Sequence, residues 1–359
     1  MGAQSPVALT EASPPATVLG DQAIFTSVFS HTGEGYRIVA ASAGLQVDER
    51  REITQRSPSH GSLCGEAPDR LAVSVYPLAS GRFCVAHSRH AGFEHTARGG
   101  QRVHTHAVVL TDADLRRFQC NPLRVHASLA AAIPDQPVVK PPLRLDPLCL
   151  TVSPASPWGT VTAPPADMNA EQICALLSLL LAGERVVVVG AGYSHAAFEW
   201  TIMALPLCAR RTVAGSVGLK FSPGRQMRLT FIGRNQREAQ RAISGHGIRW
   251  FDVASAQRPE PSAFDSWLEV IGRWWSQRRH GEISGLASQI IQDASPRALR
   301  RIAAVCEDID RVQTAGEAML AALVRKYAAF AVAGEPEADL VRRFREAADR
   351  RAQLLSASP

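Results

Sequence analysis

Two histidines lie two residues apart in the segment "RVHTHAVVL" (102–110). Its β-branched residues are typical of a strand, in which residues i and i+2 point to the same side, so we expect His104 and His106 to stand side by side. Two adjacent imidazoles could hold zinc or iron if a third ligand joined them. The candidates for that third ligand, all from the preceding segment, are His87, His90 and His95.

The sequence lacks the further ligands that a metal site would need. No carboxylate or cysteine pair stands at metal-ligand spacing near these histidines. Histidines on a half-buried strand more often pack with their ring nitrogens hydrogen-bonded. We therefore expect no metal and no other cofactor. A metal-dependent enzyme that uses the hairpin from His87 to His106 is kept as an alternative function.

A serine at position 194 follows a predicted buried strand and precedes a predicted helix in "VVVVGAGYSHAAFEW" (186–200). The spacing of Gly192, Ser194 and Ala196 is close to the G-x-S-x-G turn that exposes a nucleophilic serine in hydrolases. Such an enzyme would also need a histidine, for which His246 and His280 are candidates, and flanking strands that the sequence does not show. We therefore predict no catalytic residue, and a hydrolase that uses Ser194 is the other form of the alternative.

Composition and charge exclude several classes of protein. The 359 residues carry 39 basic and 33 acidic side chains, and the net charge of +6 is too dispersed to predict a nucleic-acid-binding face. The seven cysteines include no CxxC pair, which favours reduced thiols and a cytoplasmic location. No signal peptide is recognisable. No apolar run approaches the roughly 18 residues that a membrane-spanning helix needs.

The elements that must position these residues fall into segments of different character. Residues 1–20 are rich in proline, serine and alanine, and are expected to form a flexible leader. Short β-branched runs then alternate with two amphipathic helices, the second beginning at Thr111 or Asp112 and ending at Asn121-Pro122. This pattern predicts an α+β domain over 21–132 with a mainly antiparallel sheet. Residues 133–167 are proline-dense and predict a linker with one edge strand, "LCLTV".

The second half of the chain predicts an α/β domain over 168–258 and a helical region over 259–359. A helix with Asn169 as its N-cap precedes the unbroken apolar run "ERVVVVG", which is typical of a strand buried on both faces. The segment 216–229 lacks the Gly-Lys-Ser/Thr ending of a phosphate-binding loop and is expected to be a hairpin or loop. In the helical region, the expected helix starts are Ser262, Ser295-Pro296 and Glu335-Pro336.

Four segments together resemble a known family. They are "QAIFTSVFSHTGEGYRIVAASAGL" (22–45), "SPSHGSLC" (57–64), "THAVVLTDADLRRFQCNPL" (105–123) and "ALPLCARRTVAGSVGLKFSPGRQMRLTFI" (204–232). The order and content of these segments are similar to the bacterial GTPase-associated protein family of the first class, with its type-two N-terminal domain followed by its middle domain. The resemblance implies a GTPase encoded nearby as partner, in a bacterial NTP-dependent conflict or signalling system. It carries no catalytic residues to this sequence.

The resemblance directs attention to surfaces that could contact a GTPase. Two glycine-rich loops, 30–36 and 215–225, are flanked by predicted strands and polar at their tips, and they make Glu34, Lys220 and Arg225 the candidate partner-binding residues. The basic face of the last helix is a candidate for a helical partner. The function expected from the sequence is a cytoplasmic, non-enzymatic adaptor or regulator of a GTPase.

Overall fold

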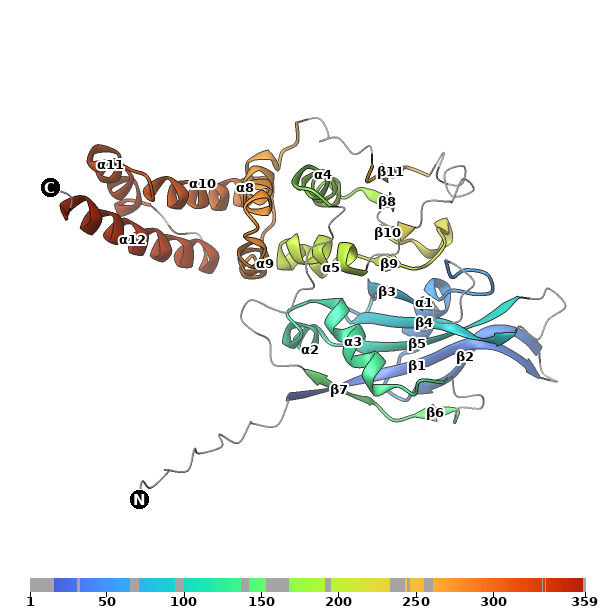
Figure 1. Cartoon of the computed structure of the whole chain (residues 1–359). Helices are drawn as coiled ribbons and strands as arrows, with labels where there is room; N and C mark the ends of the chain where they lie inside the picture. The colour runs from blue at the N-terminus through green and yellow to red at the C-terminus, as the bar shows by residue number, and fades with distance from the viewer. Residues whose placement is uncertain are drawn as a thin grey trace, which may run out of the picture.

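A computed structural model shows an α+β protein built on one large mixed sheet (Figure 1). The sheet joins the N-terminal part of the chain to its middle, and the C-terminal part is helical. The structure describes residues 16–30, 33–64, 71–93, 100–136, 142–152, 168–190, 195–232, 243, 246–254, 261–330, 332 and 334–357.

The N-terminal half of the sheet is antiparallel. Its strands, in spatial order, are β3 (Leu71–Pro77), β4 (Phe83–Phe93), β5 (Gln101–Leu110), β1 (Ala16–Ser30) and β2 (Gly33–Ser42). Two short strands complete this half of the sheet. The strand β6 (Arg144–Leu145) is the exception to the antiparallel pattern, since it pairs parallel with β2. The strand β7 (Leu148–Val152) pairs antiparallel with the first residues of β1.

Both faces of this half are covered, so its central strands are buried on both sides. On one face, α1 (Val47–Arg56) places Ile53 in a cluster with Tyr76 and Cys84. The other face carries α2 (Asp112–Arg117) and α3 (Pro122–Ala132), and there Leu129 packs in the same cluster as Val85. Because side chains alternate between the two faces of a strand, most residues of β3, β4 and β5 are buried.

The sheet continues into the middle of the chain through β9 (Gly215–Val217), which pairs antiparallel with β3. Beyond β9 the strands are parallel to one another, in the order β10 (Leu229–Ile232), β8 (Arg185–Val189) and β11 (Ile248–Asp252). Packed against this half are α4 (Ala170–Leu181) and α5 (His195–Ala204), and α6 (Leu207–Arg210) follows α5 directly. A capping box between Asn169 and Gln172 begins α4, as the sequence predicts.

Among the described residues the C-terminal region consists of five helices, of which the last three extend away from the sheet (Figure 1). Of these, α8 packs on α4 and α9 packs on α5, whereas α10, α11 and α12 pack mainly on one another. Within the described residues, no helix is both long and apolar enough to cross a bilayer. The bounds are α8 (Asp265–Ser276), α9 (His280–Gln289), α10 (Pro296–Val312), α11 (Glu317–Ala328) and α12 (Glu335–Ser356).

The structure differs from the sequence expectations at several chain segments. The strand β1 begins at Ala16, inside the expected leader, because residues 16–20 pair with β7 from the proline-dense segment. Of the two alternatives predicted for 216–229, the hairpin is wrong and the loop is found, because β9 and β10 are parallel and the segment between them is a loop with a short 3-10 helix (Pro223–Arg225). The helix expected from Ser262 begins at Asp265, since the Ser262 hydroxyl accepts a hydrogen bond from the amide of Phe264 and caps the turn before it.

Candidate functional site

A row of histidines lies between the antiparallel sheet and the helices that cover it. His87 on β4 and His106 on β5 are paired residues of adjacent strands, so their side chains share a face. The ring of His87 stacks on that of His126 from α3 with 5.1 Å between centroids, and His126 stacks at 6.4 Å on His195 at the start of α5. The strand pair and two helices therefore bring together histidines from four separate parts of the sequence.

Hydrogen bonds satisfy part of this row. His87 Nδ1 lies 2.9 Å from His126 Nε2, and His106 Nε2 lies 2.6 Å from Gln22 Oε1 on β1. A hydrogen bond between two imidazoles needs one nitrogen to donate and the other to accept, so the accepting ring is neutral. The Nε2 atoms of His104 and His195 are buried, and no described residue bonds to either.

Burial holds these histidines in the neutral form. Burial, assisted by the charge of Arg89, lowers the pKa of His87 and of His104 to about 4. Burial also lowers the pKa of His106 and of His126 to about 3, with a smaller contribution from the neighbouring histidines. A neutral imidazole is a good metal ligand, yet among the described residues no three His, Cys, Asp or Glu side chains lie close enough to share a metal ion.

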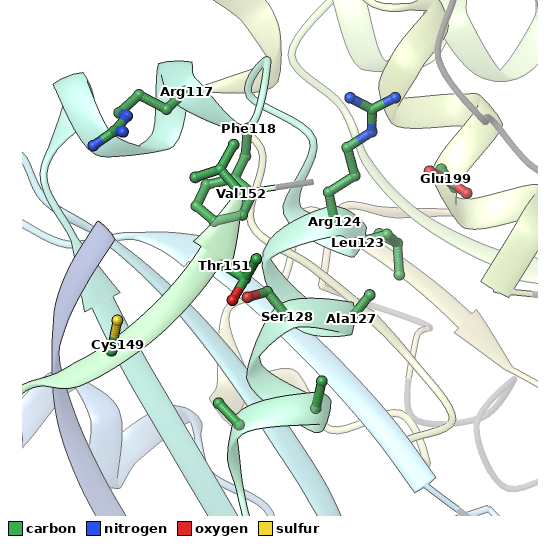
Figure 2. Close-up of a pocket in the computed structure, with 12 residues that line it drawn as sticks. Arg117, Phe118, Leu123, Arg124, Ala127, Ser128, Cys149, Thr151, Val152 and Glu199 are labelled. Carbon is green, nitrogen blue, oxygen red and sulfur yellow. The ribbon is translucent and has the colours of Figure 1, made fainter. Parts of the chain in front are cut away.

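A hollow of about 700 Å³ opens beside this row, between α3 and β7 (Figure 2). Its walls combine small and apolar side chains with five polar or charged ones, Arg117, Arg124, Ser128, Thr151 and Glu199. In Figure 2 the hydroxyls of Ser128 and Thr151 point toward each other across it, and Arg124 lies at its rim. The full lining is Arg117, Phe118, Leu123, Arg124, Ala127, Ser128, Ala131, Ala132, Cys149, Thr151, Val152 and Glu199.

Asn121 fixes one end of this hollow. Its side-chain oxygen accepts hydrogen bonds from the amides of Leu123 and Arg124, so it is the N-cap of α3, and its amide nitrogen donates to Glu199 Oε1 on α5 at 2.7 Å. The sequence interpretation took Asn121-Pro122 as the end of a helix and missed α3. An N-cap asparagine followed by proline at the first helical position is typical of a helix start. The same two residues could therefore have predicted α3, which forms one wall of the hollow.

The two loops expected to contact a partner meet one small hydrophobic cluster. The buried members of this cluster are Leu63, Ala72, Val103 and Leu219, and Tyr36 packs against them. Tyr36 follows the β1–β2 turn, and Leu219 directly precedes Lys220, so both predicted loops are anchored at the same end of the sheet.

The structure describes the side chains of two of the three predicted partner-binding residues. Lys220 is exposed and its amide donates to Ser62, which fixes the loop. Arg225 is half-buried and donates to the carbonyl oxygen of Lys220 at 2.7 Å. Glu34 lies in β2 opposite Phe29, and its side chain lies outside the described residues.

The other candidates do not gather into a catalytic set among the described residues. Ser194 lies outside these residues. His280, a candidate histidine for the hydrolase alternative, makes edge contacts with Trp200 and Trp275. His90 lies on β4 opposite Val103, and His95 lies outside the described residues.

Comparison with known proteins assigns part of the chain. No curated protein matches it at a significant level. Residues 19–149 match the family model described as GTPase-associated protein 1, N-terminal domain type 2. The match runs from β1 into β7, so it includes the antiparallel strands, the histidine row of β4, β5 and α3, and most of the hollow. The resemblance seen in the sequence is thereby confirmed for this part of the chain: residues 19–149 are similar to the N-terminal domain, type 2, of GTPase-associated protein 1.

Proposed function

We propose that this protein is a non-enzymatic adaptor or regulator that binds a GTPase encoded nearby, in a bacterial NTP-dependent conflict or signalling system. The observation that carries the proposal is the match of residues 19–149 to a GTPase-associated domain. The rest of the chain, including the region 168–258 that resembles the family's middle domain, adds a rigid platform on the same sheet.

The loops anchored by Leu63, Val103 and Leu219 support this proposal as a contact surface. A regulator must distinguish two nucleotide states of its partner, and loops on a rigid scaffold supply such surfaces. Both loops begin from strands of the continuous sheet and share one cluster, so a partner could contact both at once. Lys220 and Arg225 give the 215–225 loop positive charge, and the sequence of the 30–36 segment contributes the acidic residue Glu34.

The test is binding of the neighbouring GTPase in its two nucleotide states. Purified protein is immobilised and the GTPase is added with GDP or with a non-hydrolysable GTP analogue. We expect a difference in affinity between the two states. The variants Glu34→Lys, Lys220→Glu and Arg225→Glu should each weaken binding by about 1–3 kcal/mol, the range for an interfacial charge that matters.

The matched control is Arg300→Glu, because Arg300 is an exposed arginine on α10 in the C-terminal region. It reverses the same charge outside the proposed surface and should leave binding unchanged. Thermal unfolding of each variant separates a lost contact from a lost fold. No binding in either nucleotide state refutes the function. Binding that survives the triple variant refutes the surface and moves attention to the C-terminal helices.

A further inference from the structure

Within the part of the chain that the structure describes, β7 has one edge that pairs with no other strand. Among the described residues β7 pairs with β1 alone, through partners from Ala16↔Val152 to Gly20↔Leu148. Figure 2 shows β1 on one side of β7 and α3 on the other, with the hollow between β7 and α3. An antiparallel strand turns the N–H and C=O groups of alternate residues to its free side, where they are available to a further strand.

The side chains along β7 suit an open strand edge. Leu150 is buried in the main core, whereas Cys149 and Thr151 on either side of it are exposed. The facing wall is one side of α3, where Ala127, Ser128 and Ala131 lie at helical spacing. These small side chains leave room for the side chains of a segment placed between helix and strand.

The charge at the rim selects the kind of segment. Arg124 is half-buried and donates only to neutral groups in the described part of the chain, with Nη1 at 3.0 Å from Gln119 Oε1. Arg117 is exposed and donates to the carbonyl of Thr17 at 2.8 Å. No described carboxylate pairs with either guanidinium. The acidic group of the lining is Glu199, on α5, whose Oε1 accepts a hydrogen bond from Asn121.

We propose that the groove between β7 and α3 binds an extended, acidic segment of a partner protein, which adds to the free edge of β7 as a strand. Main-chain hydrogen bonds to β7 would supply affinity, and alternate side chains would enter the groove against α3. Carboxylates near the rim would meet Arg117 and Arg124, where a guanidinium can hold a carboxylate through two hydrogen bonds. The proposal does not depend on the GTPase proposal, because the loops at 30–36 and 215–225 do not line this groove.

The test begins with random octapeptides displayed on phage and selected on the full-length protein, with counter-selection on Ser128→Trp, which fills the groove. We expect enriched sequences to contain aspartate or glutamate together with β-branched residues, and to lack proline. A fluorescein-labelled synthetic copy of the leading peptide is then titrated by fluorescence anisotropy. Its Kd should rise at least tenfold with Arg124→Glu and stay within twofold with the control Arg300→Glu.

Two further measurements distinguish strand addition from other modes of binding. N-methylation of alternate peptide amides should abolish binding for one alternate set and spare the other, because only one set can face β7. The bound peptide should also slow the alkylation of Cys149, the exposed cysteine beside the groove, as followed by mass spectrometry. The proposal is overturned if selection on the wild-type protein gives no enrichment over selection on Ser128→Trp, or if the enriched peptides are helical or basic. It is also overturned if the two sets of N-methylated peptides bind with the same affinity.

Discussion

Mild acid should destabilise the folded protein well above the pH at which carboxylates titrate. Four buried histidines, His87, His104, His106 and His126, have folded-state pKa values of about 3 to 4. Their pKa in the unfolded chain is about 6.5. Between these values the unfolded state binds more protons than the folded state, so the free energy of unfolding falls as pH falls. The contribution of these histidines to stability is fully present above their pKa in the unfolded chain. It is lost as the pH falls toward their pKa in the folded protein.

The size of this loss of stability depends only on the histidine pKa in the unfolded chain, as long as the pKa in the folded protein stays well below 6. Each such histidine lowers the free energy of unfolding by about 0.7 kcal/mol between pH 7 and pH 6, so four together lower it by about 3 kcal/mol. Glu49 does not interfere in this window. Burial alone would raise its pKa, but hydrogen bonds from Arg82 and Ser80 lower it to about 2, and its contribution is lost only below about pH 4.5.

The assay is urea denaturation at pH 7.0, 6.5 and 6.0 at constant ionic strength. The variant His126→Phe keeps an aromatic ring in the stack and removes one titrating group, so its loss of stability over the same range should be smaller by about 0.7 kcal/mol. A free energy of unfolding that is flat or rising from pH 7 to pH 6 would refute the reasoning.

Three other substitutions test separate parts of the structure. Arg82→Met should cost about 3 kcal/mol of stability, because it leaves the buried carboxylate of Glu49 without its guanidinium partner; urea melts measure this, and a loss below 1 kcal/mol contradicts it. Gly218→Ala should also destabilise by more than about 1 kcal/mol, because φ is +81° and the new methyl group would lie 2.6 Å from the Leu71 carbonyl oxygen. Ser194→Ala should leave GTPase binding unchanged, and a large loss at an unchanged melting temperature would count against a non-enzymatic function.

Local patterns in the sequence predicted most individual elements. The His104–His106 segment was expected to be a strand, and it is the central part of β5. Thr111 and Asn169 were expected to cap helices and do so through side-chain hydrogen bonds. These features depend on residues within a few positions of each other, so composition and periodicity are sufficient to find them.

Long-range pairings could not be found in this way. The partner of β3 beyond β4 is β9, more than a hundred residues later, and the partner of β7 is the start of β1. The stack of His87, His126 and His195 likewise depends on how α3 and α5 pack over the strands. Nothing in the local sequence of one element encodes which distant element it meets, so the candidate site emerged only from the fold.

Because β3 pairs with β9, the chain cannot be cut after the matched segment without exposing a strand edge. The family match ends at residue 149, but the sheet does not end there, since β3 has β4 on one side and β9 on the other. A fragment cut after residue 152 would uncover the backbone of β3 along "LAVSVYP", whose inner five residues are all buried in the intact protein. An uncovered apolar strand edge of this kind pairs with the edges of other copies of the fragment and promotes aggregation. The matched segment therefore depends on β9, which follows it in the chain, to cover this edge of its sheet.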